Sequence, residues 1–147
     1  QKNAPCGLGA RDILRTEMKY CLYGNDISEK INPLEAKLNW VVSFKKSNFM
    51  GSENILHQKH NKPKQKLISF IMNVRAIPRT GYNIYSKGEL IGTVSSGTMS
   101  PSLNKGIGLG YIKEKYSLKN LEIEIRNKMY SATIVEGPFL TNTSLKN

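Results

Sequence analysis

Two arginines near the start of the chain have the residue type and spacing to bind an anionic group. Arg11 and Arg15 are four residues apart in a segment that reads as a helix preceded by two glycines, Gly7 and Gly9. A guanidinium presents two parallel donors that match a carboxylate, and the free N–H groups of a helix start add positive potential. Arg11 lies in the first turn, close to glycines that let another group approach. The sequence therefore predicts a carboxylate-binding site at Arg11.

The element that positions these arginines is a helix expected to run to Leu22. Its apolar residues are four apart and so share one face; they are Ala10, Leu14, Met18 and Leu22. Gly24-Asn25 is expected to end it, because both residues tolerate the left-handed conformation. A solvated structural helix with surface arginines is the alternative. A dinucleotide-binding loop is rejected, because the third glycine and a preceding β-strand are both missing.

Composition and charge limit the classes of protein to which this chain can belong. The 147 residues suffice for one domain with a core, and no stretch is apolar enough to span a membrane or to act as a signal peptide. The chain starts without Met, so we expect a piece of a longer protein. The net charge of +11 attracts polyanions, and its densest basic stretch is residues 57–66. Cys6 and Cys21 form no CxxC motif, so no zinc site is expected.

The first third of the chain reads as helix, turn and strand. After the turn at 24–28, Asn32 suits a helix N-cap, with Pro33 at the first helical position and Glu35 reaching back from the third. Residues 38–44, rich in Trp and Val, are expected to form a strand. A short helix with a Ser cap is predicted over residues 52–58, followed by an exposed loop to Lys66.

The remainder of the chain reads as short strands separated by turns. Strands are expected over residues 67–74, 82–85, 89–94, 106–112, 121–126 and 129–135, with a loop over 95–102. In 106–112 glycine alternates with bulky residues, which suits a strand that another backbone approaches closely. The fold class predicted is α+β and mostly β. It comprises a helix-and-strand remnant of a preceding α/β subdomain (residues 1–48) and a small antiparallel β-barrel (residues 49–147).

These segments resemble, in the right order over nearly the whole chain, the aminomethyltransferase (T protein) family of the glycine cleavage system. The matching positions are Gly7-x-Gly9-Ala10-Arg11-Asp12-x-Leu14-Arg15-x-Glu17, Leu22-Tyr23-Gly24-Asn25-Asp26-Ile27, Pro33-x-Glu35-Ala36-x-Leu38-x-Trp40, Phe49-x-Gly51, Pro78-Arg79-x-Gly81-Tyr82, Ile91-Gly92-x-Val94-x-Ser96-Gly97, Ser100-Pro101-Ser102-Leu103, Ile107-x-Leu109-Gly110-Tyr111 and Pro138-Phe139. The Leu22 to Asp26 run favours this family over folate-linked dimethylglycine and sarcosine oxidising enzymes and an iron-sulfur assembly factor.

The resemblance implies a transferase. Members take the aminomethyl group from the lipoyl arm of the acidic H protein, release ammonia and pass the methylene to tetrahydrofolate, which is the one small-molecule partner expected. The chain resembles the end of the central folate-binding subdomain and the whole C-terminal barrel. The family's assisting Asp lies in the N-terminal half, so we expect no catalytic residue in this chain and no activity of the chain alone. The expected location is the bacterial cytoplasm or, in a eukaryote, the mitochondrial matrix.

Three folate-binding residues follow from the resemblance. Arg11 matches a folate contact of the family, with a structural arginine paired to Asp12 or Glu17 as the alternative. Tyr20 and Trp40 are aromatic residues able to flank the pterin or aminobenzoyl ring, and burial in the core is their alternative. One departure is the absence of a Tyr after Pro138-Phe139, where members of the family often place one against the folate.

Two other functions remain open. A basic β-barrel could serve as a binding module for nucleic acid, but Tyr82 and Tyr85 are three apart and fall on opposite faces of a strand, so no aromatic platform is evident. We therefore expect no nucleic-acid partner, and no membrane. The other alternative is a structural domain that only docks the acidic carrier protein, which predicts carrier binding without folate binding.

Overall fold

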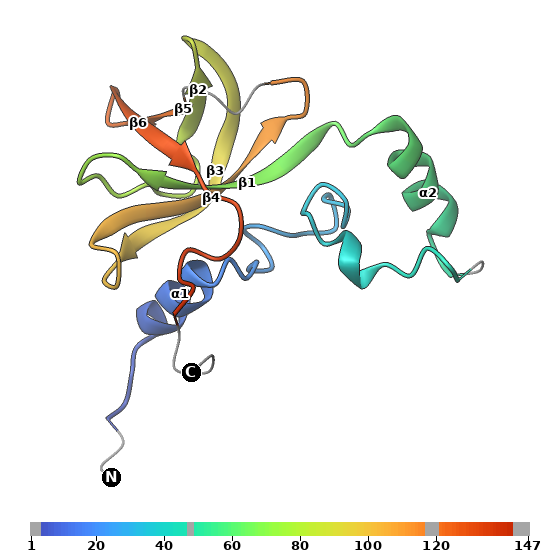
Figure 1. The fold of residues 1–147 in the computed structure, drawn as a ribbon, viewed down its shortest axis with the longest axis horizontal. Helices are drawn as coiled ribbons and strands as arrows, with labels where there is room; N and C mark the ends of the chain where they lie inside the picture. Colours follow the sequence, from blue (N-terminus) through green and yellow to red (C-terminus); the bar gives the residue numbers. More distant parts are fainter. Residues whose placement is uncertain (1–3, 47–48, 117–120, 143–147) are drawn as a thin grey trace.

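The structure is a computed structural model that describes residues 4–46, 49–116 and 121–142. Six antiparallel strands close into a barrel in the order β1-β4-β3-β2-β5-β6 (Figure 1). The strands are β1 (Gln65–Met72), β2 (Asn83–Ser86), β3 (Glu89–Ser100), β4 (Lys105–Lys113), β5 (Leu121–Ile125) and β6 (Lys128–Ile134). The prediction of a small antiparallel barrel is confirmed.

The barrel is filled by apolar side chains that alternate with outward-facing residues along each strand. Phe70, Ile84, Ile91 and Ile123 are fully buried within one cluster. Long ladders join β4 to β1 and to β3, whereas β1 and β6 share three pairs, Phe70 to Ile134 being the first. This cluster belongs to the barrel alone. A second buried cluster, which includes Ile107, Leu109 and Tyr111 of β4, packs against Cys21 and Ile31 and attaches the segment before residue 65 to the outside of the barrel.

The glycines of β4 make room for neighbouring groups, as the sequence predicts. A Cβ built on Gly108 would lie 2.5 Å from the ring of Phe70, and one on Gly106 would lie 2.0 Å from the carbonyl oxygen of Ala76. Each alternate glycine thus lets a bulky core residue or a second backbone approach β4.

Replacing Gly108 by alanine is expected to destabilise the protein by about 1–3 kcal/mol, because the new methyl overlaps the Phe70 ring in a packed core. The matched change Gly9→Ala meets no atom within 4 Å and lies inside a helix, so it is expected to stabilise by roughly 0.5–1 kcal/mol. Urea unfolding of both variants measures these changes. Equal destabilisation by the two would contradict the assignment of Gly108 to a close approach.

The first helix, α1 (Leu8–Glu17), is shorter than predicted. The expected end at Gly24-Asn25 is wrong, because Lys19 already adopts a left-handed backbone with φ 60° and Tyr20 N–H turns back to Arg15 O. The predicted apolar stripe is not buried: Ala10 is exposed, and Leu14 is 64% exposed. The buried face of α1 instead carries Thr16 and Glu17, which face the barrel.

The strand predicted over residues 38–44 is wrong. The chain instead forms successive turns over 33–37 and a 3-10 helix, η1 (Asn39–Val41). The N-cap prediction is confirmed, since Asn32 Oδ1 accepts Leu34 N–H and Glu35 N–H, and Glu35 Oε2 accepts Asn32 N–H. The turns begun by this cap continue to Val41. No strand among the described residues pairs with this segment, so the β-propensity of Trp40-Val41-Val42 does not decide its structure.

Two other boundaries differ from the prediction. Helix α2 (Ser52–Asn61) ends three residues later than predicted. The predicted Ser cap is wrong: the N-cap residue is Gly51, with a φ of 83°, and no side chain caps the helix. The predicted loop over 95–102 is mostly strand, because β3 continues to Ser100. Its polar serines bond carboxylates from the N-terminal segment. None of the helices in the described ranges is long and apolar enough to cross a membrane.

Candidate functional site

A buried carboxylate fastens the N-terminal segment to the barrel. Asp26, whose side chain is fully buried, accepts hydrogen bonds from the hydroxyls of Ser95 at 2.5 Å and Ser96 at 2.9 Å on β3. It also accepts Leu22 N–H at 2.9 Å, which closes the turn after α1. Tyr111 on β4 donates its hydroxyl to the backbone oxygen of Asp26 at 2.7 Å, and burial raises the pKa of Tyr111, which keeps this donor protonated.

Arg15 neutralises this carboxylate. Its Nη1 lies 2.6 Å from Asp26 Oδ2, and its Nη2 lies 2.6 Å from Asp12 Oδ1 and 3.0 Å from the Ser96 hydroxyl. The side chain of Arg15 is 11% exposed. Its Nε also donates to Asp12 Oδ1 at 2.8 Å and its Nη1 to Tyr20 O at 3.3 Å, so all five N–H donors of the guanidinium have acceptors within the protein. Arg15 is therefore the structural member of the pair of arginines in α1.

A second carboxylate of α1 is also bound to the barrel. Glu17 Oε1 accepts the hydroxyl of Ser100 at 2.5 Å, and Glu17 O accepts Phe139 N–H at 2.9 Å from the segment after β6. Together with the bonds of Asp26, these bonds hold α1 against β3 and against the segment after β6. Figure 1 shows α1 and this C-terminal segment next to each other beside the barrel. Helix α1 thus has a fixed orientation, with one face on the barrel and the other toward solvent.

Arg11 lies on the solvent side of α1. It is exposed, and no hydrogen bond or ion pair joins its side chain to another of the described residues. Asp12 pairs with Arg15, and Glu17 bonds Ser100, so neither serves as the partner that a structural role for Arg11 requires. The structure leaves this guanidinium available for an anionic group.

Two adjoining hollows contain the predicted site residues: Tyr20 lines both of them, Arg11 lines only one and Trp40 only the other. One hollow, of about 580 Å³, is mainly apolar and includes Arg11, Leu14 and Tyr20. The other, of about 480 Å³, includes Tyr20 and Trp40. Met18 and Tyr20 line both. Tyr20 is 65% exposed and Trp40 is 79% exposed, so neither belongs to the core.

The chemistry of this surface suits a flat ligand with a negative end. Apolar and aromatic side chains offer stacking area, and each hollow has cations in its lining. Arg11 lines one hollow, and Lys19 and Lys37 line the other. Burial and the neighbouring Lys37 lower the pKa of Lys19, whose Nζ donates to Val135 O at 3.3 Å. Neither lysine is predicted from the sequence as a site residue; both lie in turns and have a positive φ, 60° at Lys19 and 56° at Lys37.

Cys21 lines the hollow of Tyr20 and Trp40, and it offers a chemical probe of this site. Both cysteines are free, Cys6 being exposed and Cys21 partly buried. Burial, reinforced by Asp26, raises the pKa of Cys21, so less thiolate is present at a given pH. We expect a thiol reagent at pH 7 to modify Cys6 at least tenfold faster than Cys21. The Cys21 rate should rise steeply as the pH is raised toward and above 9.

Mass spectrometry of peptides after timed alkylation measures both rates. The Cys6→Ser variant isolates the Cys21 reaction. Equal rates for the two thiols at pH 7 would contradict the partial burial of Cys21.

A third hollow, of about 460 Å³, lies at the end of the barrel where the segment after β1 meets the β5–β6 turn. Its cations are Arg75, Arg79, Arg126 and Lys128, and no acidic residue lines it. Such a cluster suits an acidic surface more than a small apolar ligand. Among the described residues, no group of three or more His, Cys, Asp or Glu side chains is placed to hold a metal ion.

Comparison with known proteins identifies relatives of both halves of the chain. The family described as "Glycine cleavage T-protein C-terminal barrel domain" matches residues 65–140, and the one described as "GCVT N-terminal domain" matches residues 1–46. A curated aminomethyltransferase of Halothermothrix orenii is 46% identical over 138 residues, and one of Flavobacterium psychrophilum is 48% identical over 138 residues. Each alignment covers 92% of this chain, but the chain spans only 39% and 38% of those proteins.

A solved structure has the same fold. The crystal structure of the glycine cleavage system aminomethyltransferase T from Bartonella henselae superposes with a TM-score of 0.84 at 31% sequence identity. The match covers 91% of this chain and 39% of that one.

Proposed function

Since the chain belongs to the glycine cleavage T-protein family, whose named relatives are aminomethyltransferases, we propose that it forms the C-terminal part of a tetrahydrofolate-dependent aminomethyltransferase. The reaction proposed transfers the methylene of the aminomethyl-lipoyl H protein to tetrahydrofolate and releases ammonia. The role of this chain is to hold the folate and to dock the carrier.

One observation carries the folate proposal. Arg11 is exposed without a partner among the described residues, and it stands beside a surface that contains Tyr20 and leads to Trp40. Tetrahydrofolate combines a flat pterin and an aminobenzoyl ring with glutamate carboxylates. In this proposal the guanidinium of Arg11 binds a carboxylate through two parallel hydrogen bonds, and the aromatic side chains flank a ring.

The carrier proposal rests on charge. The hollow formed by Arg75, Arg79, Arg126 and Lys128 has no acidic lining residue, and the chain as a whole carries +11. Opposite charges steer association and speed encounter more than they raise affinity. An acidic lipoylated H protein fits this surface, in the cytoplasm of a bacterium or the matrix of a mitochondrion. We propose no catalytic residue here, so the chain alone should bind without turnover.

Titration of tetrahydrofolate into the 147-residue chain tests the proposal. Trp40 is the only tryptophan, so its fluorescence should change saturably if the ring docks in this hollow. Calorimetry at two salt concentrations distinguishes the alternative of a polyanion-binding module, whose affinity for nucleic acid falls steeply with salt. Tight, salt-sensitive binding of an oligonucleotide with no response to folate would overturn the proposal.

A further inference from the structure

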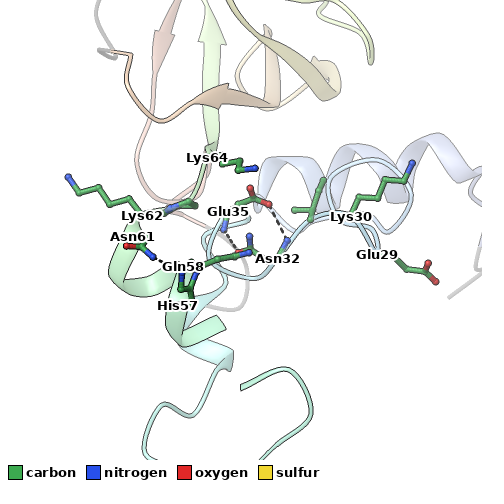
Figure 2. A pocket seen from close by; sticks show the side chains of 11 residues that line it. Glu29, Lys30, Asn32, Glu35, His57, Gln58, Asn61, Lys62 and Lys64 are labelled. Carbon is green, nitrogen blue, oxygen red and sulfur yellow. Dashed lines mark hydrogen bonds between the residues drawn. The ribbon is translucent and has the colours of Figure 1, made fainter. Parts of the chain in front are cut away.

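A separate polar hollow lies away from the folate surface, between the turn at residues 29–35, the end of α2 and the link that follows it (Figure 2). Its volume is about 620 Å³, and it shares no lining residue with the two hollows beside α1. Its polar residues include Lys30, Glu35, Gln58, Lys62 and Lys64.

One wall of this hollow is rigid. The Asn32 cap fixes the turn that carries Glu35, and Glu35 Oε2 accepts Asn32 N–H at 3.2 Å. The backbone oxygen of Glu35 accepts Leu67 N–H at 2.8 Å, which joins the turn to β1. Glu35 is 8% exposed, yet no cation of the described residues lies within 4.0 Å of its carboxylate. A largely buried carboxylate of this kind retains capacity to accept hydrogen bonds.

The facing wall holds an unsatisfied acceptor. The Oε1 atom of Gln58 on α2 is buried and has no hydrogen-bond donor among the described residues. Buried polar atoms are nearly always paired, so an exception in a hollow calls for an explanation. Figure 2 shows Gln58 beside Asn32 and Glu35. Gln58 and Glu35 line the same hollow, so a ligand held there can offer donors to both acceptors.

Lysines supply the opposite charge. Lys64 and Glu35 both line the hollow (Figure 2), but no ion pair within 4.0 Å joins the two. Lys30 and Lys62 also line the hollow, but their side chains extend outward from it in Figure 2. All three lysines are exposed and without an ion pair in the part of the chain that the structure describes. The hollow thus presents separated acceptors and cations, which a ligand with both charges would complement.

We propose that this hollow binds a small zwitterion of the amino acid class. Its ammonium group donates to the Glu35 carboxylate and to Gln58 Oε1, and its carboxylate accepts from the Lys64 ammonium. This site goes beyond the proposed transferase and does not depend on it, because it uses none of the residues assigned to folate or to the carrier.

The probe is glycine, with acetate and methylamine as comparators that each retain one charged group. Nitrogen-15 NMR spectra of the full 147-residue chain follow the side-chain amide of Gln58 and the backbone amide of Glu35 during each titration. We expect glycine to shift both signals saturably, at least tenfold more tightly than either comparator. An equal response to acetate and glycine would show anion attraction by lysines only and would overturn the proposal.

Two variants locate the site. Gln58→Leu should weaken glycine binding at least tenfold without lowering the thermal midpoint, because it removes an acceptor that the fold leaves unpaired. Gln65→Leu, the same change on β1 outside the hollow, should leave binding unchanged. Lys64→Met, at an exposed position, tests the carboxylate end independently and should weaken binding as well. Wild-type affinity in both Gln58→Leu and Lys64→Met would overturn the assignment.

Discussion

Asp26→Ala is expected to lower the free energy of unfolding by about 3–5 kcal/mol, which is the usual result of removing one partner from a buried ion pair. The side chain of Asp26 is fully buried, and its loss leaves the Arg15 guanidinium without its inner partner. The hydroxyls of Ser95 and Ser96 also lose their acceptor. Since domains are stable by about 5–15 kcal/mol, urea unfolding should show a large decrease in the midpoint.

The matched control is Asp12→Ala. Asp12 is the other carboxylate partner of Arg15, at the same 2.6 Å, but its side chain is 45% exposed. Ion pairs in contact with solvent contribute at most about 1 kcal/mol, so this variant should stay near the wild type. The pair replacement Arg15→Met with Asp26→Leu should recover part of the lost stability, because it leaves no unpaired charge. Equal, small effects of Asp12→Ala and Asp26→Ala would contradict the role given to Asp26.

The second large effect is expected for Arg11→Ala, which should weaken tetrahydrofolate binding while leaving the fold intact. A hydrogen bond to a charged group contributes roughly 1.5–3 kcal/mol, which corresponds to a roughly 10- to 150-fold loss of affinity. Stability should change little, because Arg11 is exposed and bonds no other described residue. Calorimetric titration gives the affinity, and thermal unfolding checks the fold.

Two control variants test which property of Arg11 contributes to the affinity for tetrahydrofolate. Arg11→Lys keeps the charge but loses the planar fork, so an intermediate affinity is expected. Arg126→Ala removes an exposed arginine at another hollow and should change folate affinity less than about twofold, because general electrostatic attraction of exposed charges is weak. Wild-type affinity in Arg11→Ala would remove Arg11 from the proposed site.

The barrel is predictable from the sequence, whereas the attachment of the N-terminal segment is not. Strand alternation in 121–126 and glycine alternation in 106–112 are local patterns, and β5 and β4 follow them. The stretch 95–100 is predicted as a loop because it is rich in Ser, Gly and Thr. In the structure it is part of β3, and its serines bond carboxylates some 70 to 80 residues earlier in the chain, Asp26 and Glu17. No local pattern can show a partner at that distance.

The residues of the candidate site are likewise predictable only in part, because their contacts with distant parts of the chain are not visible in local sequence patterns. Arg11 is predicted from its residue type and place in the helix as well as from the family resemblance, whereas Tyr20 and Trp40 follow from the resemblance alone. The structure brings all three to two adjoining hollows. Their roles as folate contacts stay a prediction. Arg15 is also an arginine of α1, four residues after Arg11. Its structural role is seen only in the structure, where its Nη1 lies 2.6 Å from Asp26 Oδ2. The wrong prediction of a strand around Trp40 shows that β-propensity does not decide structure where no strand of the described residues is available for pairing.

The circular strand order has a consequence for how this chain can associate with other proteins. β1 pairs with β6 as well as with β4, so each of the six strands has a neighbour on both sides. A sheet with a free edge can recruit an extended segment from another molecule, and such edges also seed aggregation. Here no strand lies at a free edge of the sheet, although β1 pairs with β6 only over Phe70–Met72. We therefore expect partners to bind mainly through side chains and connecting segments.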